Sequence, residues 1–171
     1  MDVQEKDRAL TRMMNAYGNT IVRLCTLQLR DCQLAQDASQ ETFLKAYRFM
    51  ERFRGESSEK TWLCRIALNT CRSMRRNGWF RLVEVGSLRE SLPAPQQAFD
   101  VEDDELTFAI AGLKAKYREV ILLYYYQEMK IAEIAAVLGM PEKTVSTRLS
   151  RARDMLKVKL EGGDCDEPKR A

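Results

Sequence analysis

The sequence lacks the residues and motifs that most catalytic and metal-binding sites require. It contains no histidine, and none of its five cysteines forms a Cys-x-x-Cys pair, so a zinc site of the usual pattern is not expected. It also contains no Walker-type phosphate loop and no nucleophile elbow. These absences argue against an enzyme and against a bound metal or cofactor.

Long apolar runs are missing as well. No run approaches the roughly 20 residues that a membrane-spanning helix needs. The N-terminal residues, MDVQE, lack the basic start and apolar core of a secretory signal. We therefore expect a cytoplasmic protein without direct membrane insertion. A composition of 45% hydrophobic and 31% charged residues indicates a globular chain rather than a disordered one.

The distribution of charge is more informative than the net charge of +3. Residues 60–81 contain six Lys or Arg and no Asp or Glu, whereas residues 83–107 contain seven acids and one base. Residues 141–159 contain six bases and two acids. Two basic segments separated by an acidic one suggest two contacts with a polyanion.

Apolar residues recur at three- and four-residue steps along most of the chain, which predicts an all-α protein. A first amphipathic helix would bury Leu10, Met14, Tyr17, Ile21 and Leu24. A second helix is predicted over residues 33–53, and a loop rich in Gly and Ser over residues 54–58. A third helix is predicted over residues 59–76. Its core-facing stripe would consist of Leu63, Ile66, Ala67, Thr70 and Met74.

The domain organisation follows from residues 83–104, which contain Pro93 and Pro95, several acids and little periodicity. This composition is typical of a linker. We expect two small helical domains, residues 1–82 and 105–161, joined by a flexible acidic linker over residues 83–104. A polar tail would follow over residues 162–171.

The second basic segment has the pattern of a helix-turn-helix. A short apolar stripe over residues 131–138 precedes Gly139 and Pro141, and a longer stripe then runs over residues 145–156. The second helix of such a motif presents its N-terminal residues to the major groove. The candidate DNA-binding residues are Lys143, Thr144, Ser146, Thr147, Arg148, Ser150 and Arg151, with Arg153 and Lys157 as further phosphate contacts. The alternative is a solvated basic face on an ordinary helical hairpin.

Two other faces carry polar residues at helical spacing. The third predicted helix has a second stripe formed by Trp62, Arg65, Asn69, Arg72 and Arg76. A basic face with an aromatic and an amide suits unstacked nucleic acid, although Trp62 could equally belong to the core. The second helix presents a polar face with Asp37, Gln40, Glu41 and Lys45. That face could bind a basic partner or simply be solvated.

Several of these segments resemble a known family. Residues 37–47 resemble region 2.2 of sigma-70-type RNA polymerase factors, and residues 61–69 resemble their regions 2.3 to 2.4. Residues 117–123, 133–135 and 144–153 resemble region 4. The resemblance spans roughly residues 5–160. Because the chain has room for domains 2 and 4 only, it is similar to the extracytoplasmic function (ECF) subgroup.

The resemblance implies partners and roles that spacing alone does not. Asp37, Gln40, Glu41 and Lys45 would bind the β′ clamp helices of core RNA polymerase, and domain 4 would also contact the β flap. Arg54 and its loop would hold a flipped base of the −10 element, while Asn69 would help to read a neighbouring base. Domain 4 would read the −35 element of promoter DNA. The linker would thread toward the RNA exit path, and an anti-sigma factor would control the protein.

Two other readings of the residues remain open at this point. A stand-alone helix-turn-helix regulator would explain residues 130–160 but would leave the polar faces of the second and third helices unexplained. An RNA-binding or interaction protein would show salt-sensitive binding to single strands. A pull-down with core polymerase separates the stand-alone regulator from a transcription initiation factor, because such a regulator would not need the core to reach its DNA.

Overall fold

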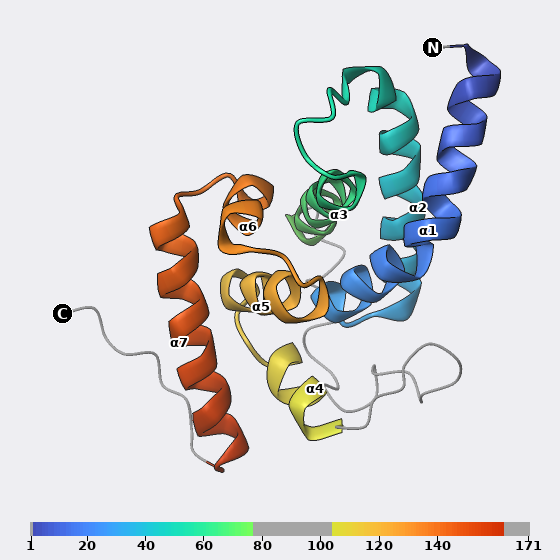
Figure 1. Cartoon of the computed structure of the whole chain (residues 1–171). Coiled ribbons are helices and arrows are strands. Elements are labelled where there is room, and N and C mark those ends of the chain that lie inside the picture. The colour runs from blue at the N-terminus through green and yellow to red at the C-terminus, as the bar shows by residue number, and fades with distance from the viewer. Residues whose placement is uncertain (1, 77–103, 163–171) are drawn as a thin grey trace. The chain divides into compact units, whose positions relative to one another are not determined.

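The computed structural model describes residues 2–76 and 104–162. Every regular element within these ranges is helical, which confirms the predicted all-α fold. The helices form two separate units, the first containing α1 to α3 and the second α4 to α7 (Figure 1). The predicted linker lies outside the described residues except for Asp104, the first residue of α4, and only residue 162 of the predicted tail is described.

The first unit consists of α1 (Val3–Leu29), α2 (Cys32–Phe49), the 3₁₀ turn η1 (Met50–Arg52) and α3 (Glu59–Arg76). Each of the three α-helices packs against the other two. Polar side chains begin α2 and α3: Asp31 accepts a hydrogen bond from the Leu34 amide at 2.8 Å, and the Ser58 hydroxyl accepts one from the Thr61 amide at 3.0 Å. Such caps each contribute about 1 kcal/mol to helix stability.

The core of the first unit differs in part from the predicted stripes. Ile21 and Leu24 are buried as expected, but Met14 is 48% exposed and its neighbour Met13 is buried. A shift of one residue turns a helix face by about 100°. The N-terminal half of α1 also makes polar contacts that an apolar stripe does not predict, from Lys6 to η1, from Asp7 to α2 and from Arg12 to α3.

The core face of α3 is likewise displaced from the predicted one. Leu63, Ala67 and Thr70 are buried as expected, but Ile66 and Met74 are only half-buried. Leu68 and Cys71 take their place in the core. Because α3 contacts both α1 and α2, its buried surface is wider than a single stripe.

The second unit consists of α4 (Asp104–Ala111), α5 (Ala115–Ile121), the π-helical turn η3 (Leu122–Tyr126), α6 (Ile131–Leu138) and α7 (Glu142–Leu160). α7 packs against α4, α5 and α6. All four members of its predicted apolar stripe are buried: Val145, Leu149, Ala152 and Leu156.

The turn between α6 and α7 depends on Gly139. Its φ of +65° lies in the left-handed region, which glycine adopts without a steric penalty. α7 begins directly after Pro141. The short helix, the glycine turn and the longer basic helix therefore form the predicted helix-turn-helix.

The helical segment over residues 115–126 changes type partway along. The α-helix ends at Ile121, and residues 122–126 continue as the π-helical turn. Leu122 and Leu123 remain in the core, whereas Tyr125 is 52% exposed. A π-helical turn is a rare element that local apolar content does not predict. Among the described residues, no helix is both long enough and apolar enough to cross a bilayer.

Candidate polymerase and nucleic-acid interfaces

The outer face of α2 presents the acidic and amide residues of the predicted polymerase site. Asp37 and Gln40 are exposed, and Glu41 is half-exposed one turn after Asp37. Ala38 and Thr42, on the opposite side of the helix, are buried. The buried side fixes the rotation of α2, so the carboxylates and the amide project together into solvent.

Lys45 lies apart from this outward face. Its ammonium donates a hydrogen bond to the Thr70 hydroxyl of α3 at 3.1 Å and pairs with Glu41 at 3.4 Å. The Lys45 side chain therefore bridges α2 and α3. This geometry links the lysine to the orientation of Glu41, and its predicted contact with a partner stays a prediction.

Leu44 is a residue of this face that the sequence prediction missed. Its side chain is 51% exposed, and it lies one helical turn after both Gln40 and Glu41. Leu44 therefore adds exposed apolar surface to the polar face of α2. Its position seven residues after Asp37 is the sequence signal that places it on the same helix face.

The loop over residues 54–58 connects η1 to α3 and is exposed throughout. Gly55 has a φ of +72°, in the left-handed region that favours glycine. Arg54 projects from the exposed loop immediately before this glycine. At the far end of the loop, Ser58 caps α3 and its hydroxyl lies 2.8 Å from that of Thr61.

An aromatic pair forms the base of this loop. The rings of Phe53 and Trp62 are stacked, with centroids 4.8 Å apart and an interplanar angle of 30°. Both residues are half-buried. Trp62 is therefore neither a full core residue nor an isolated surface platform. The pair brings the loop entrance and the first turns of α3 together beside Arg54.

Further along α3, the remaining predicted residues share one face. Arg65, Asn69 and Arg76 are exposed, and Arg72 is half-buried. Arg72 donates a hydrogen bond to the Asn69 amide oxygen at 3.3 Å. This contact uses one of the two lone pairs of the Asn69 oxygen, and the NH₂ group on the other side of the amide is a donor. The face thus combines cationic groups with one oriented amide.

The N-terminal part of α7 carries the predicted duplex-reading residues. Lys143, Ser146, Thr147, Ser150 and Arg151 are exposed, while Thr144 and Arg148 are half-buried. The Thr147 hydroxyl donates to the backbone carbonyl of Lys143 at 2.9 Å. Because buried residues occupy the opposite side of α7, these polar groups lie together on the outer surface of the helix-turn-helix.

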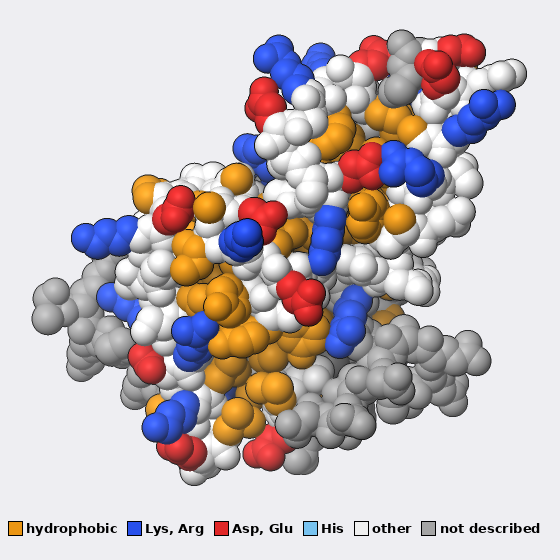
Figure 2. Space-filling model, in the orientation of Figure 1, with side chains coloured by type: hydrophobic (Ala, Val, Ile, Leu, Met, Phe, Trp, Pro, Cys, Tyr) orange, Lys and Arg blue, Asp and Glu red, His pale blue; other side chains and the backbone are white. Residues whose placement is uncertain are grey.

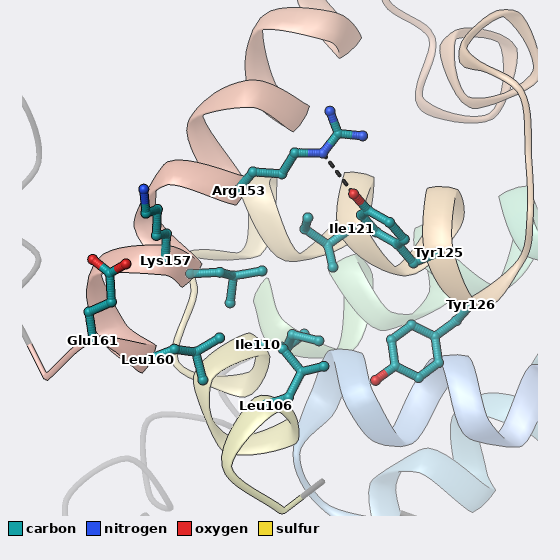
Figure 3. Close-up of a pocket in the computed structure, with 10 residues that line it drawn as sticks. Leu106, Ile110, Ile121, Tyr125, Tyr126, Arg153, Lys157, Leu160 and Glu161 are labelled. Carbon is teal, nitrogen blue, oxygen red and sulfur yellow. Dashed lines mark hydrogen bonds between the residues drawn. The ribbon is translucent and has the colours of Figure 1, made fainter. Parts of the chain in front are cut away.

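The C-terminal half of α7 borders an apolar groove of about 680 Å³ within the second unit (Figure 3). Its lining consists of Leu106, Ile110, Ile121, Tyr125, Tyr126, Leu156 and Leu160, with Arg153, Lys157 and Glu161 as its charged members. Figure 2 shows hydrophobic side chains gathered on this unit with Lys and Arg close by. Sequence reasoning did not find the groove, because its lining comes from three helices and the π-helical turn.

Arg153 is held at the groove rather than beside the exposed residues near the start of α7. Its Nε donates to the Tyr125 hydroxyl at 2.8 Å (Figure 3). The guanidinium also lies 5.3 and 5.5 Å from the ring centroids of Tyr124 and Tyr125. These distances are within the range of cation–π attraction. The predicted role of Arg153 as a phosphate contact therefore competes with contacts inside the protein.

Comparison with known families matches both units. Residues 13–81 match the family described as Sigma-70 region 2, and residues 103–156 match Sigma-70, region 4. The two matches occur in the order that the sequence motifs predict. A region 2 domain followed by a region 4 domain defines the class as a sigma-70-type transcription initiation factor.

Individual relatives agree with this class. The chain is 28% identical to the probable RNA polymerase sigma factor RfaY of Xanthomonas campestris, over 90% of this chain but 40% of that protein. It is 30% identical to the ECF RNA polymerase sigma factor SigW of Bacillus subtilis, over 89% of each chain. The solved structure of the sigma factor RpoE with the anti-sigma factor NepR, from Bartonella quintana, is similar with a TM-score of 0.73 and 26% identity, covering 95% of this chain and 100% of that one. The chain belongs to the ECF group of sigma-70 family RNA polymerase sigma factors.

Proposed function

We propose that this protein binds core RNA polymerase and directs it to promoters that carry a −10 and a −35 element. The observation that carries the proposal is the presence, in one chain, of an exposed acidic and amide face on α2 together with a basic helix-turn-helix. A stand-alone regulator needs the second feature but not the first. The family membership supports the same reading.

The proposed polymerase site is the outer face of α2. Asp37, Gln40 and Glu41 would contact the β′ clamp helices, and exposed Leu44 would add an apolar contact at the centre of the face. Lys45 would act indirectly, since its contacts with Glu41 and Thr70 fix the position of the Glu41 carboxylate. A carboxylate face of this kind favours a basic partner surface.

The two DNA contacts would differ in the form of DNA that they read. The outer surface of α7 would enter the major groove of the −35 duplex, with Arg151 able to contact a guanine and Lys143 a phosphate. The loop over residues 54–58 and the face of α3 would receive unstacked −10 bases. The stacked pair Phe53–Trp62 and the oriented amide of Asn69 support this assignment, because unstacked bases are bound by stacking and by contacts with their exposed edges.

The groove of the second unit would hold an amphipathic helix of the polymerase β flap. An apolar floor with charged residues at its edge suits the apolar face of such a helix.

We also propose control by an anti-sigma factor that clamps both domains and covers the α2 face around Asp37 and Glu41. The similarity to the sigma factor RpoE, whose structure was solved with the anti-sigma factor NepR, supports control by an anti-sigma factor.

We propose that the protein acts in the cytoplasm, where core polymerase works, and that it catalyses no reaction itself. Its contribution is binding: it would select the promoter and stabilise the opened strand, while the polymerase synthesises RNA. An anti-sigma complex that left the α2 face fully accessible would contradict the proposed mode of control.

Run-off transcription with purified core polymerase on genomic fragments tests the proposal. We expect initiation at a small set of fragments only when the protein is added. Asp37→Asn combined with Glu41→Gln should lower both initiation and co-purification with core, because the partner surface loses its charge complement. Absence of initiation at every fragment, or unchanged core binding by the double variant, would contradict the assignment of polymerase binding to this face.

A further inference from the structure

We propose that Lys6 and Arg12 of α1 are positioning residues that hold the two ends of the 54–58 loop in place for capture of a −10 base. The inference rests on the proposed function of this loop. It concerns how an exposed loop obtains a defined position, which neither the loop sequence nor α3 explains by itself.

The first tie joins α1 to the end of the loop. Glu59, the first residue of α3, accepts two hydrogen bonds from Arg12, at 2.8 Å and 2.5 Å. The two residues are 47 positions apart in sequence. Bidentate arginine–carboxylate pairs fix relative orientation as well as distance. Glu59 therefore cannot shift freely along or away from α1.

The electrostatics of the pair agree with this geometry. Hydrogen bonding and charge attraction from Arg12 lower the pKa of the Glu59 carboxyl below its ordinary value. The same contacts with Glu59 raise the pKa of Arg12. The carboxylate is thus ionised, and the tie intact, throughout the neutral range.

The second tie joins α1 to the start of the loop. Lys6 pairs with Glu51 of η1 at 2.5 Å, and the Tyr47 hydroxyl at the end of α2 donates to the Asp7 carboxylate at 3.0 Å. Lys6 and Arg12 are six residues apart, about 9 Å along an α-helix at 1.5 Å per residue. One helix, α1, therefore contacts the chain on both sides of the loop, through Lys6 before it and through Arg12 after it.

Apart from the stacked pair Phe53–Trp62 at its base, the loop has few contacts that fix its position relative to α1. All of residues 54–58 are exposed, so no apolar side chain anchors them in the core. Local hydrogen bonds occur at its borders, from the Phe53 amide to the Met50 carbonyl and from the Thr61 amide to Ser58. A binding site needs its contacting groups held close to the productive geometry. The ties from α1 supply that constraint at both ends.

Exposed ion pairs contribute little to global stability. We therefore expect their loss to alter the loop without unfolding the protein. The expected signature is a change in −10 selectivity with melting temperature, core binding and −35 selectivity unchanged. A purely structural role would not produce this separation.

The test uses holoenzyme assembled with core polymerase, on a promoter fragment identified by run-off transcription. The measurement is the initiation rate on that fragment divided by the rate after substitution of each −10 base in turn. We expect Arg12→Gln and Lys6→Gln each to lower this ratio by about three- to fivefold at the captured base, the upper range for an exposed pair. The matched control is Arg8→Gln, which removes the same charge from an exposed position on the same helix and should have no effect.

A charge exchange separates positioning from direct DNA contact by Arg12. Arg12→Glu should lower the ratio further than Arg12→Gln, because two carboxylates then repel. Adding Glu59→Arg to Arg12→Glu should move the ratio back toward the wild-type value, although the helix dipole disfavours arginine at the start of α3.

The inference is overturned if Arg12→Gln and Lys6→Gln keep the wild-type ratio, or if the exchanged pair is no better than Arg12→Glu alone. Either result leaves the proposed function intact, because the wild-type protein still initiates. A wild-type protein that initiates at no fragment would instead remove the proposed function and, with it, this inference.

Discussion

The two basic helices, α3 and α7, present their polar faces in different ways. The polar face of α7 can be identified from one local motif, which consists of α6, Gly139 and the apolar stripe of α7, and that stripe is buried against α4, α5 and α6. The face of α3 depends on partners distant in sequence, since Glu59 is held by Arg12 of α1. Intact duplex can be read by one rigid helix. An extruded base needs a pocket, which several elements must build together.

Because α3 and α7 belong to different units, each with its own core, we predict that the two units unfold independently. Leu149→Ala should destabilise the second unit by about 2–5 kcal/mol, because it leaves a cavity in the core between α7 and its neighbours. Neither tryptophan of the chain lies in that unit. In urea, the circular dichroism transition should therefore split, while tryptophan fluorescence keeps its wild-type midpoint.

The matched core substitution in the first unit is Leu63→Ala, which should shift the fluorescence midpoint instead. A fluorescence midpoint that moved equally with Leu149→Ala would show that the units stabilise one another.

Arg151→Ala should reduce binding of holoenzyme to a −35 duplex by about 1–3 kcal/mol, the discrimination that one bidentate base contact provides. Titration of labelled duplex fragments measures this loss. Lys116→Ala is the control, because it removes one exposed positive charge from the same unit at a residue outside both the predicted duplex-reading face and the groove. Equal losses for both variants would indicate a general charge effect rather than base reading.

Two glycines allow a matched test of the loop and the turn. Gly55 and Gly139 both have left-handed φ, and beyond their chain neighbours no heavy atom lies within 4 Å of the position that a Cβ would take. Alanine at each should therefore act through the backbone alone, at a cost of about 1–2 kcal/mol. We expect Gly55→Ala to reduce −10 selectivity and Gly139→Ala to reduce −35 binding, both measured on the same promoter.

If both glycine variants weakened −35 binding alone, the loop would have no part in −10 capture. If neither had an effect on DNA, their backbone conformations would matter only for folding.

The smallest expected effect is on pH dependence. The folded-state pKa of Glu59 lies below its ordinary value of 4.5, so its contribution to stability is present above that value and is lost as pH falls through the folded pKa. As the pH is lowered, the wild-type protein should lose slightly more of its neutral-pH folding stability than Glu59→Gln does. Circular dichroism during an acid titration measures this loss for each protein. Identical pH profiles would mean that the pair contributes nothing measurable.

The sequence predicts the fold well where structure is local. The helix over residues 59–76 has the bounds of α3, and the apolar stripe of α7 is buried throughout. The sequence predicts the structure poorly where contacts between residues distant in the chain determine it. Met14 is exposed although the apolar stripe predicted it to be buried, and the π-helical turn over residues 122–126 had no local signal.

The same distinction applies to the candidate sites. The polar residues of α7 could be named from the helix-turn-helix pattern, because the stripe that opposes them is local. Leu44 could have been named from its seven-residue spacing after Asp37 on the same helix. The ties from Lys6 and Arg12 and the groove of the second unit required the structure. These features arise where separate elements meet, and no spacing within one helix contains that information.

The most direct test of the division between the two faces compares Asn69→Ala and Arg151→Ala on two promoter fragments. One fragment is fully duplex, and the other has a −10 element already single-stranded and no −35 element. We predict that Arg151→Ala weakens holoenzyme binding to the duplex alone, whereas Asn69→Ala weakens binding to the opened fragment and slows opening of the duplex. Loss of duplex binding by both variants, with wild-type affinity for the opened fragment, would contradict the account.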